Sequence, residues 1–348
     1  MALTGPLNSR SVDVVVPLFR PGRWLHPCLD SVATAIGVGC RLFLVDDDPT
    51  HPVAVDAASR FFSAIPFETS SNRGFAAAAN RGIAAGTAKY VLCLNQDARL
   101  ESDYLATLVA RMEADPKLGS VSGKILHQLD PGGSPDGLID SAGFAIRRGR
   151  RPIDIGQGEV DDGRFDGWRE VFGVTGAAAL YRRAALERVA IDGQYFDERF
   201  FMYKEDVDLA WRLRAAGYTS AVDSCAVAYH ARSVGRPAVH RPGNPVHAIA
   251  LEIGRLWRQE ASKDPAIRLA SWRNQLRMVL KNDRAPDLRR SLIDILAVQA
   301  AQTTLSLVLD PVGTLRSRVE FTADVLEVLA ARRRTLKKAT QSVAEWLP

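Results

Sequence analysis

The chain has 348 residues, 47% of them hydrophobic and 24% charged, and these ordinary globular values exclude a disordered chain or a collagen-like repeat. The net charge of +5 is spread unevenly, because residues 1–229 carry 25 basic and 29 acidic side chains whereas residues 230–348 carry 20 and 11. This distribution argues against a protein that wraps nucleic acid over its whole surface and fits an enzyme whose C-terminal third meets something anionic.

The first 120 residues alternate apolar strand patterns with helical ones. Apolar runs predict buried strands at 12–19, 41–45, 65–68 and 90–94. Helical spacing follows at 24–32, 52–63 and 75–86. Strands that alternate with helices predict a Rossmann-like α/β fold, in which a mostly parallel sheet is flanked by helices on both faces.

Beyond residue 120 the pattern becomes less regular. Residues 130–169 are rich in Gly, Asp and Arg and predict a long loop or irregular insert. Residues 171–182 resume a strand-like run, and residues 197–217 predict a helix that carries several carboxylates. Helical patterns dominate from Pro245 onward, so a helical C-terminal extension is expected.

Two segments of this C-terminal region have a bearing on membrane contact. Leu292–Leu309 is about one bilayer long but contains Asp294 and several uncharged polar residues, which predicts a buried or membrane-surface helix rather than a span. Residues 312–329 carry an amphipathic stripe, and five basic residues follow within 332–338. Two interpretations stay open: the stripe lies in a membrane interface, or it packs on the catalytic domain or on a second subunit.

The four cysteines, Cys28, Cys40, Cys93 and Cys225, include no pair with CxxC spacing. That spacing is the signal of a zinc knuckle or a redox-active pair, so neither is expected. Isolated thiols in a chain of this size are typical of a cytosolic protein. No apolar stretch precedes Val12, so no signal peptide is expected and the predicted location is cytoplasmic.

Acidic clusters follow two of the predicted strands at their carboxyl ends, where open α/β sheets bind ligands. Asp97 follows the strand at 90–94, and a carboxylate there suits Mg²⁺ or Mn²⁺, while a helix N-cap is an equal alternative. The run Asp46-Asp47-Asp48 can accept the imide N–H of a pyrimidine. The residues alone favour a simple Asp-Pro turn for it.

Two further groups are candidates for chemistry. Glu205, Asp206 and Asp208 lie within four residues next to aromatic side chains, and a carboxylate near an apolar wall has a raised pKa that suits a general base. A charged helix N-terminus is the alternative. His230 ends an apolar run and is a candidate metal ligand, although a lone histidine is more often structural.

Taken in order, these pieces resemble the inverting family 2 glycosyltransferases with a GT-A fold. The resemblance covers roughly residues 12–235 and rests on VVVPLF, VDDDPT, NRGFAAAANRG, LNQDARL, GAAALYRR, FDERFFMYKEDVDLAWRLRAAGY and AYHARS. The long acidic segment is especially similar to bacterial rhamnosyltransferases that build cell-surface polysaccharide. WRNQLRMVLKN at 272–282 resembles the RN…KN segment of that subgroup.

The resemblance implies roles for individual residues. Six of them are expected around the sugar-nucleotide: Pro17, Asp47, Asn72, Gly74, Asn80 and Asp97. Asp47 would accept from the pyrimidine ring, and Asp97 would bind the Mg²⁺ or Mn²⁺ on the diphosphate. His230 is similar to the family's metal- or diphosphate-contacting histidine. Asp206 is implied as the catalytic base, with Glu205 beside it.

Two departures from the family pattern affect these roles. Asn95 occupies the first acidic position of the DxD-like motif, so metal binding depends mainly on Asp97. Pro49 and His51 replace a Ser and an Asp of the usual motif, which affects the expected ribose contact. The implied organisation is a catalytic domain at 1–240, with a nucleotide-sugar half at 1–120 and an acceptor half at 121–240. A basic helical extension follows at 241–348.

The implied reaction is inverting transfer of a sugar from a nucleotide-sugar to a hydroxyl of a glycan or polyprenyl-linked acceptor. Subgroup similarity favours dTDP-L-rhamnose as the donor and leaves a UDP-sugar open. A catalytically silent glycan-binding scaffold is the non-enzymatic alternative. A nucleotidyltransferase would need a Gly-rich loop after the first strand, and Phe19-Arg20-Pro21-Gly22 is a poor match. Peripheral contact with the inner face of the cell membrane and homo-oligomerisation through the C-terminal helices are the expected associations.

Overall fold

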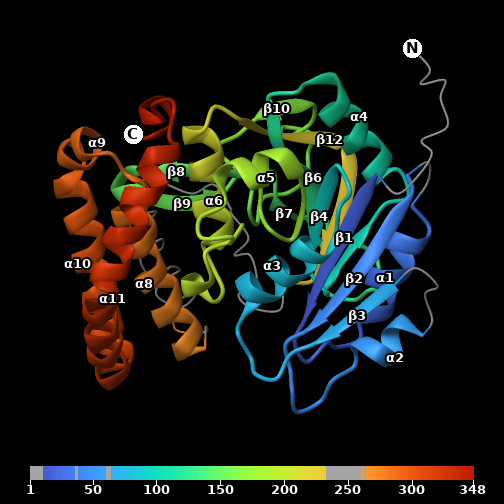
Figure 1. Cartoon of the computed structure of the whole chain (residues 1–348), viewed down its shortest axis with the longest axis horizontal. Helices are drawn as coiled ribbons and strands as arrows, with labels where there is room; N and C mark the ends of the chain where they lie inside the picture. Colours follow the sequence, from blue (N-terminus) through green and yellow to red (C-terminus); the bar gives the residue numbers. More distant parts are fainter. Residues whose placement is uncertain (1–10, 36–37, 60–63, 233–260, 262–263) are drawn as a thin grey trace.

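The computed structural model describes residues 11–35, 38–59, 64–232, 261 and 264–348. Figure 1 shows an α/β body with a group of C-terminal helices beside it. The predicted domain boundary near residue 240 and the start of the helical pattern at Pro245 both lie outside the described residues.

A ten-stranded sheet forms the centre of the body, in the order β10-β12-β6-β11-β4-β1-β2-β3, with β5 beside β12 and β7 beside β6. The first four strands are β1 (Val12–Leu18), β2 (Cys40–Asp46), β3 (Ala64–Glu68) and β4 (Tyr90–Leu94). They pair in parallel, so their carboxyl ends meet at one edge of the sheet. The predicted α/β class with a mostly parallel central sheet is confirmed.

Helices cover both faces of these strands (Figure 1). They are α1 (Leu25–Ala33), α2 (Ala54–Ala58), α3 (Phe75–Ala85) and α4 (Tyr104–Ala114). Val14 of β1 belongs to the core that contains residues of α1 and α4, and its neighbour Val15 belongs to the core that contains residues of α3. Successive side chains of β1 therefore enter opposite cores, which is why the strand is apolar at nearly every position.

The prediction of an irregular insert at 130–169 is correct for 130–138 and 155–167, but it missed the short elements between and after them. This region contains β7 (Ile139–Ser141), β8 (Phe144–Arg147), the 3-10 turn η1 (Arg148–Arg150), β9 (Arg151–Asp154) and β10 (Trp168–Glu170). β7 joins the main sheet, while β8 and β9 form a small antiparallel sheet of their own. Strands of three or four residues are too short for their alternation to show in the sequence.

The remaining elements of the body are β5 (Ala98–Leu100), β6 (Leu118–His127), β11 (Ala178–Arg182), α5 (Arg183–Val189), the 3-10 turn η2 (Glu198–Phe200), α6 (Glu205–Ala215) and β12 (Thr219–His230). The strand predicted at 171–182 is confined to its last five residues. The helix predicted at 197–217 begins only at Glu205, because Phe201, Tyr203 and Lys204 have φ angles of 61°, 68° and 70°. Such angles do not fit a right-handed helix.

The C-terminal helices are α8 (Pro265–Asn282), α9 (Ala285–Arg290), α10 (Leu292–Leu309) and α11 (Pro311–Lys338), followed by the 3-10 turn η3 (Ala344–Trp346). Met278 and Val279 of α8 share a core with Phe172 and Trp211 of the α/β body. α8 is thus anchored to the catalytic half by apolar packing as well as by the polar contacts described below.

Helices α10 and α11 differ from α8 because they leave large apolar side chains exposed. Among the described residues, α10 is the one helix long and apolar enough to cross a membrane by length and composition, with a mean hydropathy of 1.6 and 17% of the segment buried. That exposure contradicts the buried alternative for 292–309, whereas the membrane-surface alternative stays a prediction. The predicted stripe on α11 is also exposed, so it does not pack on the catalytic body.

Candidate active site

A cavity of about 710 Å³ opens at the carboxyl ends of the parallel strands. It brings together eight of the nine predicted site residues: Pro17, Asp47, Asn72, Gly74, Asp97, Glu205, Asp206 and His230. Asn80 is the exception. Its side chain bonds to the backbone of Tyr195 and Phe196 and to Glu198, so in this structure it links α3 to that segment rather than lining the cavity.

Asp97 and His230 are placed side by side by the pairing of β5 with β12. His230 lies opposite Ala98 in this antiparallel pair, and the N–H of Ala231 donates to the carbonyl of Asp97. His230 Nε2 is 3.2 Å from Asp97 Oδ1, while its Nδ1 is 2.9 Å from Asp140 Oδ2. Asp97 precedes a strand, not a helix, so the N-cap alternative is wrong.

Charges of both signs surround this histidine. Burial alone would lower the pKa of His230, but the carboxylates of Asp97 and Asp140 raise that pKa to about 10. Burial would raise the pKa of Asp140, but Arg232 and His230 lower it to about 2. Arg232 also bonds to Asp154 at 3.0 Å. The imidazole is therefore held with Nε2 toward Asp97. Both of its ring nitrogens are protonated when no metal is bound to Nε2.

The donor set fits a divalent cation only in part. A histidine with one ring nitrogen fixed by a carboxylate and the other facing a second carboxylate is the arrangement of a metal ligand. Within the described part of the chain, however, no group of three or more His, Cys, Asp or Glu side chains is placed to hold a metal. A cation would take two ligands from the chain, Asp97 and His230, and the remainder from a diphosphate and water, as Mg²⁺ commonly does.

Asp47 organises the loop that follows β3. Its carboxylate accepts from the backbone N–H groups of Arg73 at 3.0 Å and of Gly74 at 2.6 Å, and from the hydroxyl of Thr69 at 3.2 Å. Gly74 has a φ of 83°, and a Cβ there would lie 2.5 Å from Phe201, so glycine is required at this position. Asp47 lines the cavity, and its contact with a pyrimidine stays a prediction.

Asp46 and Asp48, by contrast, serve the turn after β2. Asp46 accepts from the backbone N–H groups of Asp48, Val53 and Ala54. Asp48 accepts from the N–H and hydroxyl of Thr50. The turn interpretation of the acidic run is therefore correct for these two residues.

The candidate base stands at the first turn of α6. Asp206 Oδ2 accepts from the N–H of Gly176 at 3.1 Å, and its Oδ1 accepts from the N–H of Val207 at 2.8 Å. Burial raises the pKa of Asp206, and the charge of Asp154 raises it further. Burial, followed by the charge of Asp206, raises the pKa of Glu205 well above its usual value. The pKa of Glu205 is thus raised more than that of Asp206, which favours the protonated form at Glu205 and agrees with the prediction of Asp206 as the base.

The loop that leads into α6 is held from outside by α8. Residues 201–204 include the three positive φ angles noted above, and such backbone persists only where its surroundings fix it. Asn274 of α8 donates through its amide to the carbonyls of Phe200, Met202 and Tyr203, at 2.7, 2.9 and 2.9 Å. One buried amide thus fixes three carbonyl groups of the 200–203 backbone next to the base.

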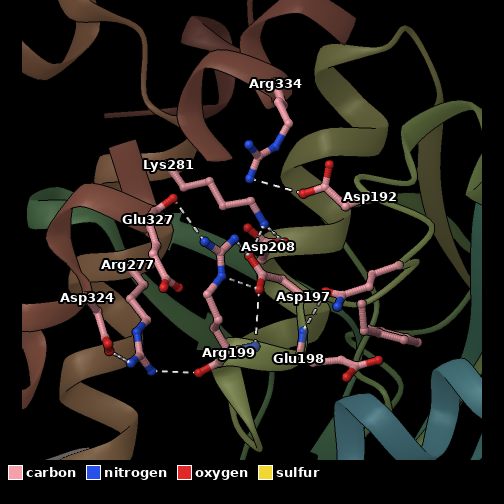
Figure 2. Close-up of polar contacts among 12 residues, drawn as sticks. Asp192, Asp197, Glu198, Arg199, Asp208, Arg277, Lys281, Asp324, Glu327 and Arg334 are labelled. Carbon is pink, nitrogen blue, oxygen red and sulfur yellow. Dashed lines mark hydrogen bonds and ion pairs between the residues drawn. The ribbon is translucent and has the colours of Figure 1, made fainter. Parts of the chain in front are cut away.

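A buried ion network ties α6 itself to α8 (Figure 2). Lys281 Nζ lies 2.7 Å from Asp197 Oδ2 and 2.8 Å from Asp208 Oδ2, and all three side chains are almost completely buried. Asn282 donates to the other oxygen of Asp208 at 2.8 Å. Figure 2 also shows Arg277 between Asp324 of α11 and the carbonyl of Arg199. Asp208 is thus a structural anchor two residues from Asp206.

Several residues of the site were not singled out as site residues from the sequence. They are Asp140, Asp154, Arg232, Asn274 and Lys281. Asp140 and Asp154 lie in the short strands that the sequence did not reveal. Asn274 and Lys281 belong to the RN…KN segment, and that resemblance was the only signal that could have found them.

Comparison with known proteins agrees with this geometry. Residues 13–190 match the family model described as glycosyl transferase family 2. The chain is 30% identical over 252 residues to the N-acetylglucosaminyl-diphospho-decaprenol L-rhamnosyltransferase of Mycobacterium tuberculosis, covering 66% of this chain and 80% of that relative. It is 27% identical over 228 residues to the pre-mycofactocin glycosyltransferase of the same species, covering 65% of this chain and 44% of that relative.

The solved structures show the fold. GalNAc-T7, crystallised with UDP, GalNAc and Mn²⁺, superimposes with a TM-score of 0.59 at 14% identity, over 97% of this chain and 57% of that chain. The match supports a GT-A fold for this chain. With its matching family model, its rhamnosyltransferase-like sequence and its GT-A fold, the chain belongs to glycosyltransferase family 2.

Proposed function

We propose that the chain transfers L-rhamnose from dTDP-L-rhamnose to a hydroxyl of a polyprenyl-linked or growing glycan acceptor, with inversion at the anomeric carbon. The observation that carries the proposal is the meeting, in one cavity, of the Asp97–His230 pair with the buried carboxylate of Asp206. The name of the relative at 30% identity supports rhamnose as the sugar and a lipid-linked acceptor. A lipid-linked acceptor would bring the enzyme to a membrane, and a nucleotide-sugar donor would make the cytoplasmic side the place of reaction.

The chain's own residues account for the proton and the charges of such a transfer. Asp206 takes the proton of the acceptor hydroxyl as that oxygen attacks, and Gly176 and Val207 hold its carboxylate in place. A single displacement needs no second nucleophile, so the configuration inverts. Thr175, Gly176 and Ala177 leave room for the acceptor because their side chains are small.

The leaving group is a nucleoside diphosphate, whose charge has to be balanced. Asp97 and His230 would hold Mg²⁺ or Mn²⁺, and the cation would offset the charge that develops on the diphosphate. Arg232 remains bound to Asp140 and Asp154 and keeps His230 oriented.

A panel of sugar nucleotides tests the proposal. The folded chain is mixed with Mg²⁺ or Mn²⁺ and, separately, with dTDP-L-rhamnose, UDP-N-acetylglucosamine, UDP-glucose and GDP-mannose, and the melting temperature is recorded. A ligand that binds only the folded state raises the melting temperature. We expect the largest rise with dTDP-L-rhamnose and metal. A larger rise in melting temperature with a UDP-sugar would assign that UDP-sugar as the donor in place of dTDP-L-rhamnose. No rise with any of the four compounds would contradict a sugar-nucleotide site.

Product analysis tests the remaining steps. Incubation with the stabilising donor and a polyprenyl-diphosphate-linked N-acetylglucosamine should release nucleoside diphosphate in step with a new glycosidic bond. We expect the anomeric configuration of that bond, measured by NMR, to be opposite to that of the donor. Retention would exclude the single displacement and require a second nucleophile.

A further inference from the structure

Helices α10 and α11 form an antiparallel hairpin whose outer face is apolar. Ser306 and Thr314 bond across its turn, and Thr303 bonds to Arg318 further along. The exposed fractions of Ile293, Val312 and Leu326 are 83%, 77% and 77%. The other large exposed apolar residues of the hairpin are Leu292, Leu296, Leu307, Val308, Leu315, Val319 and Leu329. So much apolar surface on one pair of helices marks an interaction site.

The exposed charges on this hairpin are mostly basic. Between residues 285 and 340, all of which the structure describes, the exposed basic residues are Arg289, Arg290, Arg316, Arg333, Arg334 and Lys337. Glu327 is the one exposed acidic residue in the same range. Glu320 pairs with Arg273 of α8 and with Arg316, Asp324 pairs with Arg277 of α8, and Arg334 pairs with Asp192 of the body. A second copy of the chain would bring this basic surface against itself, whereas an anionic surface complements it.

All of these exposed basic residues except Arg316 are placed at one end of the hairpin. Arg289 and Arg290 directly precede α10, and Arg333, Arg334 and Lys337 lie in the last turns of α11. Because the helices are antiparallel, these two groups share the end away from the turn at Asp310. Apolar helix faces with a basic end are the features of a helix pair that lies in the interface of an anionic bilayer.

The hairpin lies next to the rim of the cavity. α8 and α11 run in parallel, because Arg273 and Arg277 of α8 pair with Glu320 and Asp324 of α11 in the same order. The first turns of α8 line the cavity with Asp264, Ile267 and Ser271. Leu269 and Trp272, on the same turns, border a small gap shared with α10 and α11. α8 therefore lies between the cavity and the hairpin, and Figure 1 shows this helix between α11 and the α/β body.

We propose that the outer face of the α10–α11 hairpin docks on a bilayer that contains anionic lipids, and so holds the mouth of the cavity near the membrane surface. The docking itself is inferred only from the exposed apolar residues and the basic residues of the hairpin. Its usefulness to the enzyme rests on the proposed lipid-linked acceptor, because such an acceptor presents its sugar at that surface.

Vesicle co-sedimentation tests the docking. The full chain is mixed with phosphatidylcholine vesicles with or without phosphatidylglycerol, and the bound fraction is measured over a series of salt concentrations. We expect binding to the anionic vesicles that weakens with salt, since salt screens exposed charges. Replacing three basic residues (Arg289→Gln, Arg290→Gln, Arg333→Gln) should weaken it on the order of 100-fold, because each contributes about fivefold near an anionic surface.

The apolar part of the face has a matched control. The double variant Ile293→Asp and Val312→Asp should abolish vesicle binding, while Val55→Asp and Val160→Asp, each exposed by 55% on other elements, should leave it intact. Donor-induced thermal shifts should be unchanged in all of these variants, so failure of docking is distinguishable from failure of the proposed function. Equal vesicle binding by the Ile293→Asp, Val312→Asp variant and the Val55→Asp, Val160→Asp variant would overturn the proposal. So would a wild-type dimer that ignores vesicles and becomes monomeric in the Ile293→Asp, Val312→Asp variant.

Discussion

The two sides of the cavity are built by different means. On the donor side, Asp97 and Asp47 follow buried parallel strands and are held by bonds to nearby backbone and to His230. On the reacting side, Asp206 follows a loop with three positive φ angles, and α8 fixes that loop from outside. Strand ends position the donor residues, whereas a helix some seventy residues further along the chain positions the base. Substitutions on the donor side should therefore affect metal and donor binding, whereas substitutions on the reacting side should affect stability and kcat.

The largest effect is expected from Asp97→Ala, on the donor side. This change removes a candidate metal ligand and the carboxylate that faces His230, so transfer should fall below detection while the fold persists. Turnover of nucleotide-sugar is the measurement, with and without EDTA. Asp103→Ala, which removes an exposed carboxylate six residues away, serves as the control and should be active. Parent-level transfer by Asp97→Ala, or a parent enzyme indifferent to EDTA, would refute the metal role.

Lys281→Met tests the anchoring of the reacting side. It leaves the buried carboxylates of Asp197 and Asp208 with one cation fewer, and breaking a buried pair costs about 3–5 kcal/mol in the free energy of unfolding. Urea denaturation measures this loss. Lys337→Met removes an exposed lysine of α11 and should change the free energy of unfolding by less than about 0.5 kcal/mol. Equal stability of the two variants would mean that the network does not hold α6.

Asn274→Ala separates positioning of the base from binding of the donor. Loss of three hydrogen bonds frees the 200–203 backbone, and a small misplacement of a reacting group can lower kcat on the order of 100-fold. The Kd of the donor should stay near that of the parent. Gln275→Ala, at the next position of the same helix, removes a buried amide that bonds to Gly149 instead, and kcat should be retained. A similar fall of kcat in both variants would reduce the role of Asn274 to general stability.

The smallest effect concerns the pH dependence of the base. Burial and the charge of Asp154 raise the pKa of Asp206, and only the deprotonated form accepts a proton. The rate should therefore fall on the acid side at a pH above the ordinary aspartate range. Asp154→Asn removes a nearby negative charge, lowers the pKa of Asp206 and should move this acid limb to lower pH. The exposed Asp130→Asn should leave the kcat profile in place, and an upward movement with Asp154→Asn would contradict the assignment.

The same contrast explains what the sequence could and could not predict. The apolar runs of β1 and β4 are visible because both faces of these strands are buried, and the carboxylates at their ends follow directly from that pattern. Asp140 and Asp154 could not be found in this way, since their strands have three and four residues. The support that Asn274 gives to the loop is a long-range contact, and no local period or spacing encodes such a contact.

The assignment of Asp206 as base is tested most directly by Asp206→Asn, which keeps the size of the side chain and removes its basicity. Donor Kd by calorimetry and kcat of transfer are measured on the same preparation, with Glu205→Gln in parallel. We expect kcat to fall by about 10²–10⁴-fold in Asp206→Asn, as for loss of a general base, with the Kd unchanged. Normal turnover in Asp206→Asn together with lost turnover in Glu205→Gln would contradict the account and make Glu205 the base.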